Sequence, residues 1–285
     1  MNNLYVSTNC LAKSTREAVK ELADAGLNDI ELGPTQEYDD GIEDFLASLD
    51  ARFIVHNYFP PPREPFIMNF ASADPAIRER SLAQARASID FCVRVRSTLF
   101  SVHAGFMADP AFGKSHFRFE CPRPAKGDFE KAFQRFTASV KELLSYAAPR
   151  GVKIAIENNV CPEAARDYVL LCQASEFERL MKEIPSPHLG INLDLGHLKV
   201  SARTFNFDRE DFARRVSRHV FALHVHDNDG VTDTHQPIAE NSWVFPLING
   251  HDFSGQLHII LEAHHLSIQE IRAQIDLLRK RIPAR

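Results

Sequence analysis

The sequence predicts a (β/α)8 barrel, also called a TIM barrel, and three observations support this fold class. Eight short apolar runs recur along the 285 residues, helical patterns separate them, and no glycine-rich turn follows the first run. Runs that are apolar throughout are typical of strands buried on both faces of a parallel sheet. Their alternation with helices implies right-handed crossovers. A barrel of this kind needs about 250 residues, so we expect one domain over residues 1–285.

Each expected strand is a short run rich in Val, Ile, Leu and Phe. In chain order the runs are Leu4–Ser7, Asp29–Leu32, Phe53–Asn57, Leu99–His103, Lys153–Glu157, Gly190–Asp194, Phe221–His226 and His258–Glu262. The competing fold is an open doubly wound sheet, which usually carries a glycine-rich turn after its first strand. Here the first run is followed by Thr8, Asn9, Cys10 and Leu11, so we favour the closed barrel.

Helical patterns fill the spaces between the runs. The clearest covers Asp128–Ala148, where apolar residues recur at spacings of three and four and so share one helix face. Three other helices are expected to begin at a serine that is followed three residues later by a glutamate. In this pattern the two side chains satisfy unpaired backbone N–H groups at the helix start. These capping boxes are Ser14 with Glu17, Ser175 with Glu178, and Ser267 with Glu270.

Composition narrows the classes of function. The formal net charge is -5, from 33 Lys and Arg against 38 Asp and Glu, and this disfavours nucleic acid as a partner because such binding rests largely on phosphate neutralisation. Five cysteines without a CxxC pair argue against a disulfide framework or a cysteine zinc site. The N-terminus lacks a secretory pattern, and no apolar stretch approaches the roughly 18 residues that span a membrane. We therefore expect a cytoplasmic protein without a membrane partner, and homo-oligomerisation stays open.

Ionisable side chains end six consecutive expected strands. They are His56, His103, Glu157, Asp194, His224 with His226, and Glu262. The C-terminal ends of barrel strands ring one small cavity, so these side chains are expected to converge. Carboxylates brought together repel each other, and a divalent cation removes that penalty. Mixed imidazole and carboxylate ligation suits Zn, Mn, Fe or Co better than Ca. We expect one to three divalent ions, with Zn and Mn as the first choices.

Three features near the strand ends stay open on spacing alone. His224 and His226 point the same way because strand side chains alternate with period two, and either could be a metal ligand. Asp233 and His235 in the following loop could supply two more donors. Glu31 ends the second strand, where it either reaches the cavity or makes a hydrogen bond at the rim.

Two long connections follow strands four and seven, on the face where barrel enzymes hold their active sites. Residues 105–127 carry cations that either bind a phosphate or carboxylate of a substrate or belong to a solvated loop, namely Lys114, Arg118, Arg123 and Lys126. Residues 227–255 carry the only tryptophan, Trp243. Long loops on a compact domain tend to be functional.

Several motifs at these positions resemble the xylose isomerase-like barrel superfamily, which includes sugar phosphate isomerases and epimerases and is related to endonuclease IV. The resemblance runs from about Leu4 to Ile282. It rests on the segments IAIENN at 154–159, LDLGH at 193–197, HVHDNDGVTDTH at 224–235 and ILE at 260–262.

The epimerase branch implies a one-metal site that acts on a small carbohydrate. In such enzymes the metal is a Lewis acid for the developing enediolate, and a carboxylate abstracts the proton alpha to the carbonyl. The function implied is a divalent-metal-dependent isomerase or epimerase of a sugar or sugar phosphate. The resemblance assigns the metal ligands to Glu157, Asp194, His226 and Glu262, with His224 behind them. It assigns proton transfer to Glu157 and Glu262. The expected substrate contacts are His197, His103 and Glu31.

The endonuclease IV branch implies three zinc ions and hydrolysis of phosphoesters, which is the alternative function. Its ligand pattern is also complete here: His56, His103 and Glu157; Glu157, Asp194, His226 and Glu262; His197, Asp233 and His235. The negative net charge and the local sequence of residues 156–159 favour the isomerase branch. Family members commonly follow the loop histidine with a Gly-Glu-Gly turn, whereas residues 236–243 here read QPIAENSW. A non-catalytic sugar-binding protein is the third reading.

Overall fold

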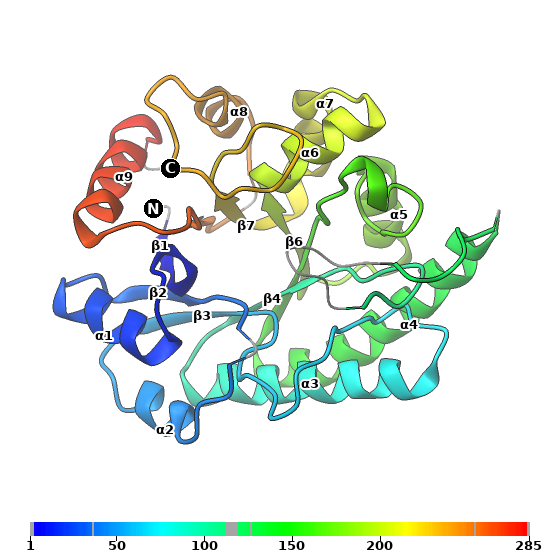
Figure 1. Ribbon diagram of the computed structural model, residues 1–285, viewed down its shortest axis with the longest axis horizontal. Helices are drawn as coiled ribbons and strands as arrows, with labels where there is room; N and C mark the ends of the chain where they lie inside the picture. The colour runs from blue at the N-terminus through cyan, green and yellow to red at the C-terminus, as the bar shows by residue number, and fades with distance from the viewer. Residues whose placement is uncertain (1–2, 36, 112–118, 126, 254, 284–285) are drawn as a thin grey trace.

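The protein is a closed barrel of eight parallel strands that pair in chain order, as a computed structural model shows (Figure 1). The structure describes residues 3–35, 37–111, 119–125, 127–253 and 255–283. The strands are β1 Asn3–Ser7, β2 Asp29–Leu32, β3 Arg52–His56, β4 Leu99–His103, β5 Lys153–Glu157, β6 Leu189–Asp194, β7 Val220–Val225 and β8 His258–Leu261. Pairing of β1 with β8 closes the sheet, so the (β/α)8 fold class is confirmed and the open doubly wound sheet is excluded.

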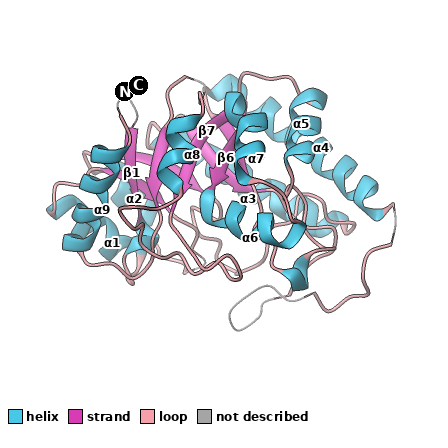
Figure 2. Cartoon of the chain, turned by 90° about the horizontal axis from the view of Figure 1, so that it is seen from above, coloured by secondary structure: helices cyan, strands magenta, loops and turns pink. Residues whose placement is uncertain are grey.

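Helices surround the strands on their outer side. They are α1 Thr15–Asp24, α2 Ile42–Ala47, α3 Pro75–Arg94, α4 Asp128–Ala147, α5 Ala174–Glu183, α6 Leu195–Phe205, α7 Arg209–Val216, α8 Val244–Gly250 and α9 Ile268–Arg281. Buried Phe, Leu, Val and Ile side chains fill the layer between barrel and helices. Figure 2 shows both chain ends beside each other at the end of the barrel where β1 begins, and long loops at the opposite end.

Two of the three expected capping boxes are present. Ser14 and Ser267 accept hydrogen bonds from the backbone N–H groups at the starts of α1 and α9. The expected start of α5 at Ser175 is wrong, because this helix begins at Ala174 and Ser175 is an exposed residue of its first turn. Glu176, not Glu178, accepts the N–H of the residue before the helix at 3.3 Å.

The interior of the barrel has an apolar layer below a polar one. The apolar layer lies toward the starts of the strands and contains Tyr5, Ile54, Leu99, Ala155, Ala222 and Ile260. Two positions further along the same strands, alternation with period two brings six buried polar side chains inward, namely Ser7, His56, Ser101, Glu157, His224 and Glu262. β2 and β6 add Glu31 and Asn192, which are also buried. The fold therefore gathers polar groups from all eight strands in one layer at the mouth.

The two long connections differ in what the structure describes. In the connection after β4, residues 112–118 and 126 lie outside the described residues, and with them Lys114, Arg118 and Lys126. The connection after β7 contains α8, which begins directly after Trp243. Among the described residues, no helix combines the length and apolar character needed to cross a membrane.

Candidate metal centre

Three carboxylates converge on one imidazole nitrogen at the centre of the polar layer. His224 Nδ1 lies 3.0 Å from an oxygen of Glu262, 3.6 Å from one of Glu157 and 3.6 Å from one of Asp194. All four side chains are buried. His224 Nδ1 makes no hydrogen bond in acceptable geometry. An imidazole nitrogen together with three carboxylate oxygens forms a donor set that suits Zn or Mn.

The two histidines at the end of β7 both lie beside carboxylates of the centre. His226 lies one residue beyond the end of the strand, and its Nε2 is 3.0 Å from Asp194. Potential ligand atoms of His226, His235 and Glu262 also lie within 4.8 Å of one another. The ring of His226 stacks on His235 with centroids 3.9 Å apart. His224 thus faces three carboxylates, whereas His226 faces Asp194 and lies near Glu262, so the assignment of His226 to the central set stays a prediction. Spacing alone could not separate them, because both side chains point inward.

A second group lies on the β3–β4 side of Glu157. His56 Nε2 is 3.4 Å from one oxygen of Glu157, and His103 Nε2 is 3.6 Å from the other. The three side chains bring potential ligand atoms within 4.8 Å of one another. His103 is the most accessible of them, with 26% of its side chain exposed. The structure thus brings together the first trio of the three-zinc pattern.

A third group lies further out, where the β7 connection crosses the mouth. Asp233 Oδ2 is 2.8 Å from His235 Nε2 and 3.1 Å from His197 Nε2. His235 has a φ of 45°, which is costly for a residue with a side chain. Its Nδ1 bonds the backbone oxygen of Glu262 at 3.0 Å, and its ring stacks between His226 and His264. These contacts hold His235 in a strained conformation beside the centre.

Asp194 connects the groups because it begins α6 as well as ending β6. Its Oδ1 accepts the backbone N–H of His197 at 2.6 Å, as an N-cap does. Its Oδ2 is the oxygen that faces His224 and His226. Asn158 anchors the same turn, since its Oδ1 accepts the N–H of Asp194 at 2.7 Å.

The charges of the centre depend on one another. Burial alone would raise the pKa of Glu157, but the imidazoles of His103, His224 and His56 outweigh it and lower the pKa to about 2. The pKa values of Asp194 and Glu262 are also lowered against the effect of burial, chiefly by neighbouring histidines. The carboxylates are therefore ionised at neutral pH.

The histidines respond in the opposite direction. Burial alone would lower the pKa of His224, but Glu262, Glu31 and Glu157 raise it well above the usual value. His235 behaves similarly: burial opposes protonation, yet contact with Asp233 and the charge of Glu262 raises its pKa to about 9. His103 is different, because burial dominates and lowers its pKa to about 4. Without a metal cation, protons on histidines must balance the carboxylates.

Two further polar side chains complete the centre, and the motifs at the strand ends do not include them. Asn192 donates to Glu157 at 2.9 Å and to the Ser101 hydroxyl at 3.1 Å. The Ser101 hydroxyl also bonds His56 Nδ1 at 2.6 Å. Asn192 and Ser101 are inward residues of β6 and β4, so period-two counting from Glu157's neighbours could have found them.

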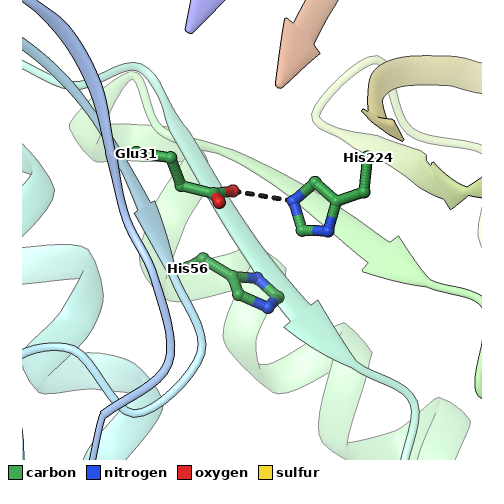
Figure 3. A group of neighbouring side chains, drawn as sticks. All are labelled: Glu31, His56 and His224. Carbon is green, nitrogen blue, oxygen red and sulfur yellow. Dashed lines mark hydrogen bonds and ion pairs between the residues drawn. The ribbon is translucent and has the colours of Figure 1, made fainter. Parts of the chain in front are cut away.

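For Glu31, which was expected either to contact substrate or to make a hydrogen bond at the rim, the structure shows a hydrogen bond. The Glu31 side chain is fully buried, and its Oε1 is 2.7 Å from His224 Nε2 (Figure 3). Among the described cations of the β4 connection, Arg123 pairs with Asp167 on the surface. Trp243 donates its ring N–H to Asp227, at 3.2 Å.

The fold and the site define a (β/α)8 barrel with histidines and carboxylates buried at its C-terminal strand ends. The model of the xylose isomerase-like TIM barrel family matches residues 19–281, and the chain belongs to this family. An uncharacterized protein of Methanocaldococcus jannaschii is 24% identical over 246 residues, which cover 85% of this chain and 82% of that protein.

Solved structures with the same fold include sugar epimerases and a nuclease relative. A D-tagatose 3-epimerase-like protein has a TM-score of 0.74 at 18% identity, covering 98% of this chain and 97% of its own. D-psicose 3-epimerase of Clostridium cellulolyticum H10, solved with D-tagatose, has a TM-score of 0.70 at 13% identity, covering 99% and 100%. AP endonuclease, family 2, from Brucella melitensis has a TM-score of 0.66 at 15% identity and covers both chains fully, 100% and 100%.

Proposed function

We propose that the protein is a divalent-metal-dependent isomerase or epimerase of a sugar or sugar phosphate. The observation that carries the proposal is the convergence of Glu157, Asp194 and Glu262 on His224 Nδ1, at 3.6, 3.6 and 3.0 Å. Glu157, Asp194, His226 and Glu262 would hold the ion, with His224 behind them, because His226 lies beside both Asp194 and Glu262. When bound, a divalent cation would neutralise the carboxylates and polarise a carbonyl oxygen of the substrate. The sugar epimerases among the structural neighbours support the substrate class.

Glu157 and Glu262 are the proposed proton-transfer groups. Both pKa values are lowered, so both side chains are in the basic form that can remove a proton alpha to a carbonyl. Asn192 fixes one oxygen of Glu157 through a 2.9 Å hydrogen bond. Two carboxylates on opposite faces of a substrate permit inversion at the carbon, and one acting alone permits 1,2-isomerisation.

His197 is the proposed group for a substrate oxygen. Its Nδ1 lies 2.8 Å from the backbone oxygen of Asn158, which accepts a hydrogen bond from that nitrogen. The opposite ring nitrogen faces Asp233 at 3.1 Å, toward the mouth. His103, with its partly exposed ring, is a second proposed substrate contact. The geometry does not favour Glu31 in this role, because the side chain is fully buried.

Solvent proton exchange tests the proposal. The protein would be loaded with Mn or Zn and incubated in heavy water with a panel of ketoses and ketose phosphates, and deuterium in recovered sugar would be measured. We expect incorporation alpha to the carbonyl with at least one sugar. Glu157→Gln and Glu262→Gln should lower the exchange rate by about 10²–10⁴-fold. Glu176→Gln, at a half-buried glutamate of α5 away from the centre, should not. Exchange that survives both substitutions would refute the assigned proton-transfer roles.

A phosphoester hydrolase with two or three metal ions is the second candidate. It is favoured by the groups His56–His103–Glu157 and His197–Asp233–His235, each with potential ligand atoms within 4.8 Å of one another. Metal analysis of protein purified without chelators distinguishes the candidates. One equivalent of metal excludes the trinuclear form, whereas three equivalents together with cleavage of a phosphodiester would replace the isomerase proposal.

A further inference from the structure

Asn158 follows directly after β5, and its carboxamide bonds the backbone of Asp194 at the end of the neighbouring strand β6. Its Oδ1 accepts the backbone N–H of Asp194 at 2.7 Å, and its Nδ2 donates to the backbone oxygen of the same residue at 3.0 Å. Asn158 and Asp194 are both buried. One side chain thus satisfies both main-chain groups of a residue that belongs to the centre.

The backbone ladder between β5 and β6 ends before it reaches Asp194. The last paired residues of the two strands are Glu157 and Asn192, whereas β6 goes on to Asp194 and pairs there with β7. After Glu157 the chain turns away from β6, since the backbone N–H of Asn159 bonds the oxygen of Leu171 at 3.2 Å. Without the side chain of Asn158, the N–H and C=O of Asp194 on this side would be buried and unsatisfied, which is costly.

The carboxamide of Asn158 takes the place of the missing strand. Amide side chains carry a donor and an acceptor together, as a peptide group does, whereas an ionised aspartate has no donor and a leucine has neither. The orientation of the amide is also fixed. Turning it over would set its NH2 group against the N–H of Asp194 and its oxygen against the oxygen of Asp194. This position therefore requires an amide and holds it in one orientation.

The backbone of Asp194 determines where its carboxylate points. Oδ1 accepts the backbone N–H of His197 at 2.6 Å, as the N-cap of α6. Oδ2 is therefore the oxygen that faces the centre, 3.0 Å from His226 and 3.6 Å from His224. A ligand held in place before the ion arrives has less freedom to lose on binding, and the hydrogen-bond partners of metal ligands tune metal affinity.

The next residue, Asn159, also makes two side-chain hydrogen bonds but bonds no proposed ligand. Its Nδ2 donates to the backbone oxygens of Gly105 and Leu170, both at 2.8 Å, and the residue is buried like Asn158. These bonds join the segments that follow β4 and β5. Of two adjacent asparagines, one thus holds a proposed metal ligand and the other holds loops together.

We propose that Asn158 is a positioning residue that replaces β5 as the partner of the Asp194 backbone and thereby holds the Asp194 carboxylate ready for a divalent cation. This inference rests on the proposed function, because it assumes that the centre binds a metal. It gives Asn158 neither a bond to the ion nor a proton to transfer. It also accounts for the two asparagines that end the segment IAIENN at 154–159, which the proposed function does not use.

A matched pair of substitutions is the first test. Asn158→Leu and Asn159→Leu each remove two buried hydrogen bonds and keep a side chain of similar size. The melting temperature of the metal-free protein would be measured for both variants and the wild type, and Zn affinity by competition with a chelator of known affinity. We expect both variants to melt lower, but only Asn158→Leu to bind Zn about 10–100-fold more weakly, the usual cost of losing a partner of a metal ligand. Equal affinities of the two variants would overturn the inference.

The second test uses the wild type, so it remains decisive if Asn158→Leu does not fold. Crystal structures of metal-free and Zn-loaded protein should both show the two Asn158–Asp194 hydrogen bonds and the same rotamer of Asp194. A carboxylate that rotates on metal binding, or the loss of either bond, would refute the inference. The two proposals fail separately. If the wild type binds neither Zn nor Mn, the proposed function fails and takes this inference with it, whereas metal binding with unchanged affinity in Asn158→Leu refutes only the role of Asn158.

Discussion

At the residue scale, His224 and His226 lie two residues apart at the end of β7 but have different surroundings. His224 Nδ1 faces three carboxylates, whereas His226 contacts Asp194 and stacks on His235. Because His226 is the proposed ligand and His224 lies behind it, we expect His226→Asn to abolish tight binding of the central ion. His224→Asn should weaken that binding without abolishing it. Metal content after gel filtration, measured for both variants beside the wild type, checks this.

The opposite order would contradict the proposed ligand set. His251→Asn, at a histidine that pairs with Glu210 away from the centre, controls for the loss of an imidazole as such. Circular dichroism of each variant confirms folding before its metal content is compared.

Sequence patterns identified the types of ligand but not which histidine at the end of β7 faces which carboxylates. Residues at the ends of six strands were predicted to converge, and Glu157, Asp194 and Glu262 lie together as that prediction requires. Which histidine reaches them depends on how far each strand rises into the mouth. That height follows from the stagger of the closed sheet, which the period-two pattern does not contain.

At the element scale, the starts of α5 and α9 give a matched pair of serines. Ser267 accepts a backbone N–H of α9 and belongs to a complete capping box, so Ser267→Ala should destabilise the protein by about 1 kcal/mol. Ser175 is exposed within the first turn of α5, and Ser175→Ala should be neutral within about 0.5 kcal/mol. Urea unfolding of both variants measures the difference. If Ser175→Ala lowered the free energy of unfolding as much as Ser267→Ala, α5 would begin where the sequence pattern placed it.

The mistaken start of α5 has a physical reason. Within residues 173–178, Glu176 follows Gln173 by three residues and Glu178 follows Ser175 by three residues. Serine is the better N-cap residue of the two, so the sequence pattern favours the later start. Glu176, however, accepts the N–H groups of Cys172 and Gln173 at 2.7 and 3.3 Å. A helix that began later would leave those donors unsatisfied.

Gly196, the second residue of α6, controls the approach of that helix to the centre. A Cβ at this position would overlap the ring of His226. We expect Gly196→Ala to cost about 1–3 kcal/mol, as overpacking does, and to displace His226. Gly250→Ala is the control, since a Cβ there meets nothing within 4 Å. Thermal unfolding and metal content of both variants test this. A Gly196→Ala protein with wild-type stability would mean that the helix or the ring can shift freely.

At the scale of the whole molecule, the fold was the most predictable feature and the outer site the least. Eight apolar runs alternating with helices require a buried parallel sheet, and the closed barrel follows from their number. The outer group depends on His235 at a positive φ and on the His226–His235–His264 stack. A strained loop conformation is held by contacts from distant segments, and no local pattern encodes it.

From the balance of charge in this centre, we predict how the stability of the whole protein depends on pH. In metal-free protein, contact with Asp233 raises the pKa of His235 from 6.5 to about 9, although burial opposes the shift. A histidine with a raised pKa stabilises the fold fully below its unfolded value, and this contribution is lost as the pH rises through 9. We expect the stability of chelator-treated protein to fall between pH 7 and pH 9.5 by on the order of 3 kcal/mol from His235 alone. Calorimetric melting across this range measures the fall.

Two variants show whether the fall belongs to the metal centre. His235→Gln should flatten the profile, because it removes the titrating group. His258→Gln should leave the profile as in the wild type: His258 lies at the start of β8, and burial lowers its pKa to about 4, so it is neutral throughout the range. If an ion occupies the outer group, zinc-loaded wild type should also lose the slope, since the cation replaces the proton as partner of Asp233. An unchanged slope in His235→Gln would show that other histidines carry the balancing protons.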